Sequence, residues 1–157
     1  MRALLLLLPL ALLACTEEPD SGCEANTQLE IDTNDLISDY REDIGLQPLL
    51  LDACASEVAR VHSEDMAAGR VPFSHDGFDA RAEEIGLILS GVTAVGENVA
   101  WLSAGFPDPA NAAYEGWLGS PGHLANIETD VFNTSGMAVA TDADGGTYFT
   151  HLLIAAD

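Results

Sequence analysis

Apolar side chains recur every three to four positions in four stretches of the chain, and polar or glycine residues bound each stretch. This spacing places the apolar residues on one face of a helix. Asp52 and the pair Asp108–Pro109 are typical helix starts, because aspartate caps free backbone N–H groups and proline fits the first helical turn. We predict helices over 36–44 (with caps in 33–35), 52–69, 78–85 and 109–117.

The C-terminal part of the chain has the pattern of strands. Residues 136–140 and 148–154 are extended runs on either side of a turn at 142–146, which predicts a β-hairpin. Residues 98–102 predict a further strand, and Ser120–Gly122 predicts a turn before His123. Helices before and between such strands indicate an α+β domain whose mostly antiparallel sheet is covered by helices.

Near the start of the chain Arg2 precedes an apolar run, Ala3–Leu13, that is broken only by Pro9 and leads into Leu12-Leu13-Ala14-Cys15. A transmembrane helix needs about 20 apolar residues, so this shorter run has the pattern of a secretory signal peptide. Its end resembles the bacterial lipobox, and we expect cleavage before Cys15 and acylation of that cysteine. Cleavage elsewhere, with plain secretion, is the alternative. Several acyl chains would give durable membrane anchoring, and Thr16 favours the outer membrane where a cell has one.

Composition divides the rest of the chain. Residues 15–32 are rich in acidic and hydroxyl side chains, which predicts a flexible tether, and residues 33–157 have the size of one domain.

Loss of Arg2 with the signal peptide leaves four basic and twenty-six acidic residues, a formal net charge of −22. Such a chain repels phosphate backbones, so we expect no nucleic-acid partner. We attribute the acidity to solubility or to a high-salt environment.

Cysteine usage agrees with an exported protein. Lipidation of Cys15 leaves Cys23 and Cys54 as an even pair, which predicts a disulfide. On the chain-entropy model, closing this loop of about thirty residues stabilises the fold by roughly 3–4 kcal/mol.

Several short blocks follow one another in a specific order along the chain. They are Tyr40–Arg41, Gly45–Leu49, Ala59–Met66 (ARVHSEDM), Phe73–His75, Gly96–Ala100 (GENVA) and Trp117–Ile127 (WLGSPGHLANI). In this order they resemble the CAP superfamily (cysteine-rich secretory protein, antigen 5, pathogenesis-related 1), also called SCP, in its short bacterial form. The resemblance runs from about residue 34 to the end of the chain.

The resemblance implies an α-β-α sandwich with a cleft in which two histidines and two acidic residues converge. His75, Glu97 and His123 match three of these positions, and Ser120 stands where the longer eukaryotic members have a glutamate. The three matching residues suit a divalent metal, zinc first and calcium or magnesium after it. Two alternatives stay open: Glu97 orients a histidine, or the histidines hydrogen-bond across a polar cleft without metal.

Other candidate residues fit the cleft less well. His62 lies beside Val58 on a predicted helix that lacks the second histidine of a zincin motif, so we expect a buried histidine rather than a ligand. His151 lies in the last strand and faces either the core or the cleft, where it would be a third histidine ligand. Ser120 is expected to line the cleft, but its surroundings lack the Gly-x-Ser-x-Gly pattern of a triad hydrolase.

Two functions follow from the resemblance. The first is a non-enzymatic, monomeric domain, anchored to a membrane through Cys15, that binds an envelope component or an apolar small molecule. The second is a metal-dependent, peptidase-like hydrolase in which His75 and His123 hold the metal and Glu97 serves as base or third ligand. Both place the protein outside the cytoplasm.

Overall fold

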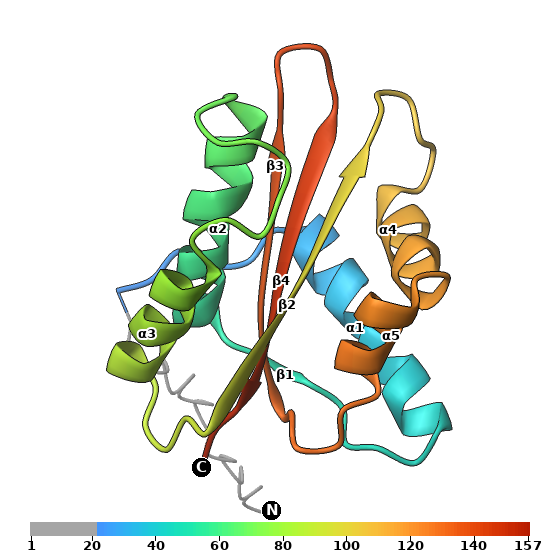
Figure 1. Cartoon of the computed structure of the whole chain (residues 1–157). Coiled ribbons are helices and arrows are strands. Elements are labelled where there is room, and N and C mark those ends of the chain that lie inside the picture. The colour runs from blue at the N-terminus through green and yellow to red at the C-terminus, as the bar shows by residue number, and fades with distance from the viewer. Residues whose placement is uncertain (1–21) are drawn as a thin grey trace, which may run out of the picture.

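A computed structural model describes residues 22–157 as a sheet between two layers of helices (Figure 1). One face of the sheet is covered by α2 and α3, and the other by α1, α4 and α5. In chain order the elements are α1 (Gln28–Asp43), β1 (Leu50–Leu51), α2 (Ala53–Ala67), α3 (Phe78–Ile88), β2 (Ala94–Leu102), α4 (Pro109–Leu118), α5 (Pro121–Ile127), β3 (Thr134–Thr141) and β4 (Thr147–Ala155).

The sheet has the strand order β1-β3-β4-β2. The strands β3 and β4 form the predicted antiparallel hairpin, and β2 pairs antiparallel with β4 from Ala94 opposite Ala155 to Leu102 opposite Thr147. The short β1, which the sequence did not predict, runs parallel to β3. The α+β class and the α-β-α sandwich are therefore confirmed, and β2 forms one edge of the sheet.

The first helix begins earlier than predicted, at Gln28. The Thr27 hydroxyl accepts a hydrogen bond from the Glu30 N–H, and the Glu30 carboxylate accepts one from the Thr27 N–H, which together make a capping box. Residues 28–32, which composition assigns to the flexible tether, are thus the first turns of α1.

Glu30 explains why composition was misleading here, because its side chain is fully buried. Its carboxylate accepts hydrogen bonds from Arg60 Nη1 at 2.7 Å and from the Val139 N–H at 3.0 Å. Burial opposes its ionisation, but the bonds from Arg60, Thr27 and Val139 outweigh that effect and lower the pKa of Glu30. An acidic residue that reads as solvated in the sequence therefore joins α1, α2 and β3.

The structure confirms the two helix starts that the sequence predicts from aspartate caps. The side chains of Asp52 and Asp108 accept hydrogen bonds from the N–H groups of Ala55 and Asn111, at 2.7 and 3.1 Å. Three other predictions need correction: α3 continues through Gly86 to Ile88, β2 starts at Ala94, and residues 121–127 form α5 instead of a turn. Pro121 occupies the first position of α5, where a missing N–H does no harm.

The core has two parts, one on each face of the sheet. On the side of α1, α4 and α5, Trp117 packs edge-on against Phe149 with ring centres 6.3 Å apart. On the side of α2, the close approach of the helix requires Gly136, since a Cβ there would lie 2.5 Å from the carbonyl oxygen of Ala55. The predicted disulfide between Cys23 and Cys54 is present and ties the segment before α1 to the start of α2.

Within residues 22–157, no helix is long and apolar enough to span a bilayer. The signal peptide and the acylation of Cys15 lie outside the described residues and stay predictions.

Candidate functional site

Three residues singled out from the sequence meet beside the edge strand β2. His75 lies in the loop between α2 and α3, Glu97 on β2 and His123 on α5. His75 Nδ1 lies 2.8 Å from Glu97 Oε1, and the ring centres of His75 and His123 are 6.3 Å apart. Because a carboxylate can only accept, Nδ1 donates to it. This leaves Nε2 of the half-exposed His75 ring to meet a ligand.

The Glu97 carboxylate also binds Arg81, which the sequence analysis did not single out. Arg81 Nε donates to Glu97 Oε2 at 2.7 Å and Arg81 Nη2 donates to Oε1 at 2.9 Å. The side chains are 11% and 2% exposed, so the pair is almost completely removed from solvent. Gly77, at φ +80°, allows the sharp turn that leads from His75 into α3 and brings Arg81 back to Glu97.

A sequence signal for Arg81 does exist. The chain contains only four arginines after Arg2, and one of them follows the candidate His75 closely, in the next predicted helix. A basic residue at that position is a natural partner for the candidate carboxylate of Glu97.

Side chains of α4 and α5 cover the free edge of β2. Asn126 Nδ2 donates to the carbonyl oxygen of Glu97 at 3.1 Å, and Trp117 Nε1 donates to that of Val99 at 3.0 Å. These bonds satisfy two acceptors that an edge strand would otherwise present to another chain. The edge of β2 beside the histidines is therefore closed to an incoming strand.

Two further bonds fix the histidines. The Asn98 side chain donates to the carbonyl oxygen of His123 at 3.1 Å. In the loop before α3, the carbonyl oxygen of Ser74 lies 2.9 Å from His62 Nε2, so His62 anchors the segment that carries His75. His62 is buried, which confirms the expectation that it is a structural histidine.

The pKa of His123 is lowered, first by its burial and then by the proximity of His75. His123 is therefore neutral at pH 7 and can offer both a donor and an acceptor nitrogen. Ser120 lines the same cavity as His123, at the start of α5.

His151 lies in the core and not in the cleft, which corrects the alternative of a third histidine ligand. The strand register places it opposite Asn98 and Met137, on the face that α4 covers. Its ring is fully buried, 5.7 Å from the Trp117 ring, and its Nε2 lies 3.0 Å from Ser135 Oγ. Burial, and then Arg41, lower the pKa of His151 to about 3.

The arrangement does not fit a metal centre with three protein ligands, the number that catalytic zinc takes. His75 and His123 can supply two imidazoles, but both oxygens of Glu97 already accept hydrogen bonds from Arg81 and His75. Over residues 22–157, no group of three or more His, Cys, Asp or Glu side chains is placed to hold a metal ion. The carboxylate is compensated internally, which leaves Nε2 of His75 and the neutral His123 ring as the histidine groups that can meet a ligand.

Two cavities flank the histidine pair along β2. One, of about 330 Å³, opens at His75. The other, of about 240 Å³, is lined by His123, Phe73 and Trp101 among other residues. Phe73 and Trp101 are 52% and 49% exposed, and the ring centre of each lies 6.5 Å from that of Tyr148. The cleft therefore combines neutral polar atoms with an exposed aromatic surface.

Every arginine of the described residues is already engaged. Arg41 donates to backbone carbonyl oxygens, and the other three bind carboxylates: Arg60 to Glu30, Arg70 to Asp65 and Arg81 to Glu97. The sequence has no lysine. An anionic ligand would therefore meet no uncommitted arginine or lysine in the cleft.

Comparisons with known proteins agree with the fold. Residues 35–153 match the family model described as "CAP: Cysteine-rich secretory protein family". An extracellular protein containing an SCP domain from Bacillus anthracis is 29% identical, with a TM-score of 0.63 over 80% of this chain and 40% of its own. This chain thus spans less than half of that protein.

More distant structures share the fold. An outer surface protein from Borrelia burgdorferi is 17% identical, with a TM-score of 0.68 over 85% of this chain and 97% of its own. NaASP2, solved with Zn²⁺, is 13% identical, with a TM-score of 0.63 over 84% of this chain and 83% of its own. No curated protein matches the chain.

Proposed function

The chain belongs to the CAP (cysteine-rich secretory protein) family, and from that premise we propose that it is an extracytoplasmic binding module. We propose further that it binds a neutral saccharide of the cell envelope in the cleft along β2. The observation that carries this proposal is the second cavity, where Phe73 and Trp101 stand exposed beside His123.

Two observations support a location outside the cytoplasm: the N-terminal sequence and the descriptions of two relatives. The leader and the lipobox-like Leu12–Cys15 predict export and acylation of Cys15. The Bacillus anthracis relative is described as extracellular and the Borrelia burgdorferi one as an outer surface protein. An acylated chain with a net charge of −22 would stand on the membrane without docking to anionic headgroups.

The chemistry of the cleft favours a saccharide. Sugar rings have apolar C–H faces that stack on aromatic rings, and Phe73 and Trp101 offer such rings. Sugar hydroxyls both donate and accept, which suits the neutral His123, Nε2 of His75 and the Ser120 hydroxyl. The lack of an uncommitted arginine or lysine disfavours anionic ligands, and the covered edge of β2 disfavours an extended peptide that pairs with the strand.

The rival function is a metal-dependent hydrolase, and NaASP2 with Zn²⁺ shows that a protein of this fold has been obtained with zinc. We favour binding because Glu97, the residue that would act as base or third ligand, is held by Arg81. A carboxylate in a nearly buried ion pair is poorly placed to accept a proton from water.

Tryptophan fluorescence tests the proposal directly, because the chain has only two tryptophans and Trp117 is buried. Titration of the leader-free chain with chitotetraose, a neutral oligosaccharide, should shift the emission of Trp101 in a saturable way. By calorimetry, Trp101→Ala should weaken binding roughly tenfold, as for other ligands that stack on aromatic rings.

Phe106→Ala provides the matched control, because Phe106 is 47% exposed and lies outside the lining of both cavities. This variant should bind like the wild type. Absence of saturable binding, or equal binding of an anionic galacturonate tetramer, would contradict a neutral-saccharide site.

A further inference from the structure

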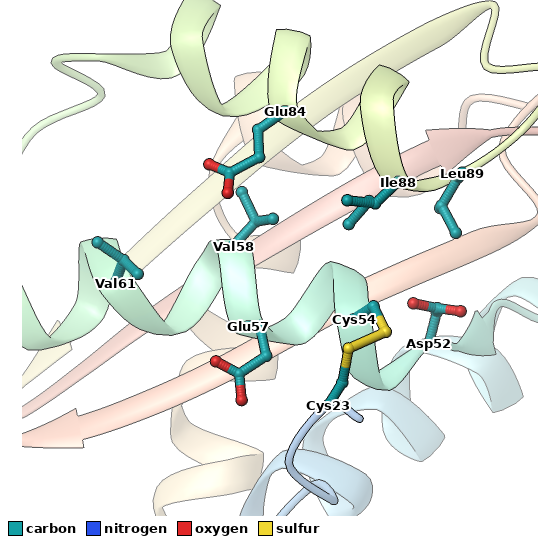
Figure 2. A pocket seen from close by; sticks show the side chains of 9 residues that line it. All are labelled: Cys23, Asp52, Cys54, Glu57, Val58, Val61, Glu84, Ile88 and Leu89. Atoms are coloured by element: carbon teal, nitrogen blue, oxygen red, sulfur yellow. A yellow bond between two sulfur atoms is a disulfide. The ribbon is translucent and has the colours of Figure 1, made fainter. Parts of the chain in front are cut away.

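A larger cavity lies between α2 and α3, and no histidine lines it. This α2–α3 groove has a volume of about 600 Å³, within the range of small-molecule sites. Figure 2 shows its lining: Cys23, Asp52, Cys54, Glu57, Val58, Val61, Glu84, Ile88 and Leu89. None of these residues lines the two cavities beside β2.

The interior of the groove is apolar. The helix α3 buries only Ile85 fully, so its contact with α2 leaves apolar side chains uncovered on both helices. Val61 on α2 is 61% exposed and Ile88 on α3 is 43% exposed, and Val58 and Leu89 complete the apolar part of the lining. The Cys23–Cys54 disulfide closes one end of the groove (Figure 2). An apolar ligand could remove this surface from water.

Carboxylates surround the apolar interior. Glu84 extends from α3 toward α2, while Asp52 and Glu57 stand at the start and on the side of α2 (Figure 2). Among the described residues, Asp52 and Glu57 accept hydrogen bonds from backbone N–H groups alone, those of Ala55 and Glu24. Within residues 22–157, none of the three carboxylates takes part in a salt bridge.

The two nearby arginines of the described residues, Arg60 and Arg81, form their salt bridges with other carboxylates. Arg60 has an electrostatic interaction with Glu57, but its guanidinium forms a salt bridge with Glu30 at 2.7 Å. Arg81, on the same helix as Glu84, is committed to Glu97. In the described part of the chain these three carboxylates thus have no salt-bridge partner. The molecule that complements them and the apolar surface has an apolar chain and a cationic head.

We propose that the α2–α3 groove is a second binding site, specific for cationic amphiphiles. The apolar chain lies between α2 and α3 against Val58, Val61, Ile88 and Leu89. The cationic head, an ammonium or guanidinium group, faces Glu84, Glu57 and Asp52. Burial of the chain supplies most of the affinity, and the carboxylates select the charge of the head. This proposal does not depend on saccharide binding in the cleft along β2.

Three probes with the same dodecyl chain separate the two contributions. We would titrate the leader-free chain by calorimetry, below micelle formation, with dodecyltrimethylammonium, dodecyl maltoside and dodecyl sulfate. The cationic probe should bind with one-to-one stoichiometry, roughly tenfold more tightly than the neutral probe, and the anionic probe should bind most weakly. Added salt should reduce the preference for the cation, because it screens exposed charges.

Neighbouring residues on α3 provide matched variants. Glu84→Gln should weaken the cationic probe roughly threefold, whereas Glu83→Gln, the same charge change outside the groove, should leave it unchanged. Ile88→Ser should weaken the cationic and neutral probes alike by about fivefold, and Leu87→Ser should weaken neither.

Each of two results would overturn the proposal. One is equal binding of the cationic and anionic probes. The other is an equal effect of each groove variant and its neighbour, which would mean that the probes coat the surface instead of occupying the groove.

Discussion

Replacing Arg81 by methionine would leave the buried carboxylate of Glu97 without its cation. Three hydrogen bonds disappear, two to the Glu97 oxygens and one to the carbonyl oxygen of Asp76. Removal of one member of a buried ion pair costs about 3–5 kcal/mol. His75 still donates to Glu97 in the variant, so we expect the lower end of that range, about 3 kcal/mol, a large part of the 5–15 kcal/mol of a typical domain.

Urea denaturation followed by Trp117 fluorescence would measure this loss, because urea does not screen charge as guanidinium does. The double variant Arg81→Met/Glu97→Gln should recover part of the stability, since it removes the uncompensated charge. We expect a coupling energy of about 2 kcal/mol in the double-mutant cycle. A coupling below about 0.5 kcal/mol would refute the reasoning, because Glu97 would then not depend on Arg81.

Three other predictions concern buried groups. The pKa of His151 is about 3 in the folded protein and about 6.5 in the unfolded chain. The contribution of the neutral His151 to stability is therefore fully present above pH 6.5 and is lost as the pH falls toward 3. When the pH is lowered from 7 to 5, the free energy of unfolding should fall by about 2 kcal/mol more in the wild type than in His151→Gln, as measured by denaturant unfolding. Equal decreases would argue against a buried neutral imidazole. Cys23→Ser/Cys54→Ser should destabilise by about 3 kcal/mol, seen as a lower Tm; an unchanged Tm would show that the bridge does not constrain the unfolded chain. Glu30→Ala removes the acceptor oxygens, so it should cost about 2–3 kcal/mol and speed hydrogen exchange at the Val139 amide. Unaltered exchange would contradict the role of Glu30 as the acceptor of that N–H.

Local signals carried much of the fold prediction. Asp52 and Asp108 predict helix starts through their capping side chains, and the turn at 142–146 predicts the hairpin. These predictions succeed because each feature depends on a few adjacent residues. The ordered short blocks carry the family resemblance, and that resemblance predicted that His75, Glu97 and His123 meet, as they do in the structure. Such features need no knowledge of distant contacts.

Features that depend on distant partners were missed. Glu30 reads as part of a solvated tether because Arg60, which buries it, lies thirty residues away. The sequence shows Arg81 as a basic residue close to His75, but the turn at Gly77 decides that it reaches Glu97. The period of a strand cannot say whether His151 faces the core or the cleft. In each case tertiary contacts decided what local sequence left open.

Zinc binding tests the central claim, that Glu97 serves Arg81 and His75 and not a metal. Zinc would be titrated by calorimetry into chelator-treated wild type, Arg81→Gln and Arg81→Gln/Glu97→Gln. We expect no stoichiometric binding to the wild type in the micromolar range and at least tenfold tighter binding to Arg81→Gln, because that change frees the Glu97 carboxylate as a third ligand. The double variant should lose this gain. Tight one-to-one binding to the wild type that His75→Ala, His123→Ala and Glu97→Gln each abolish would contradict the claim.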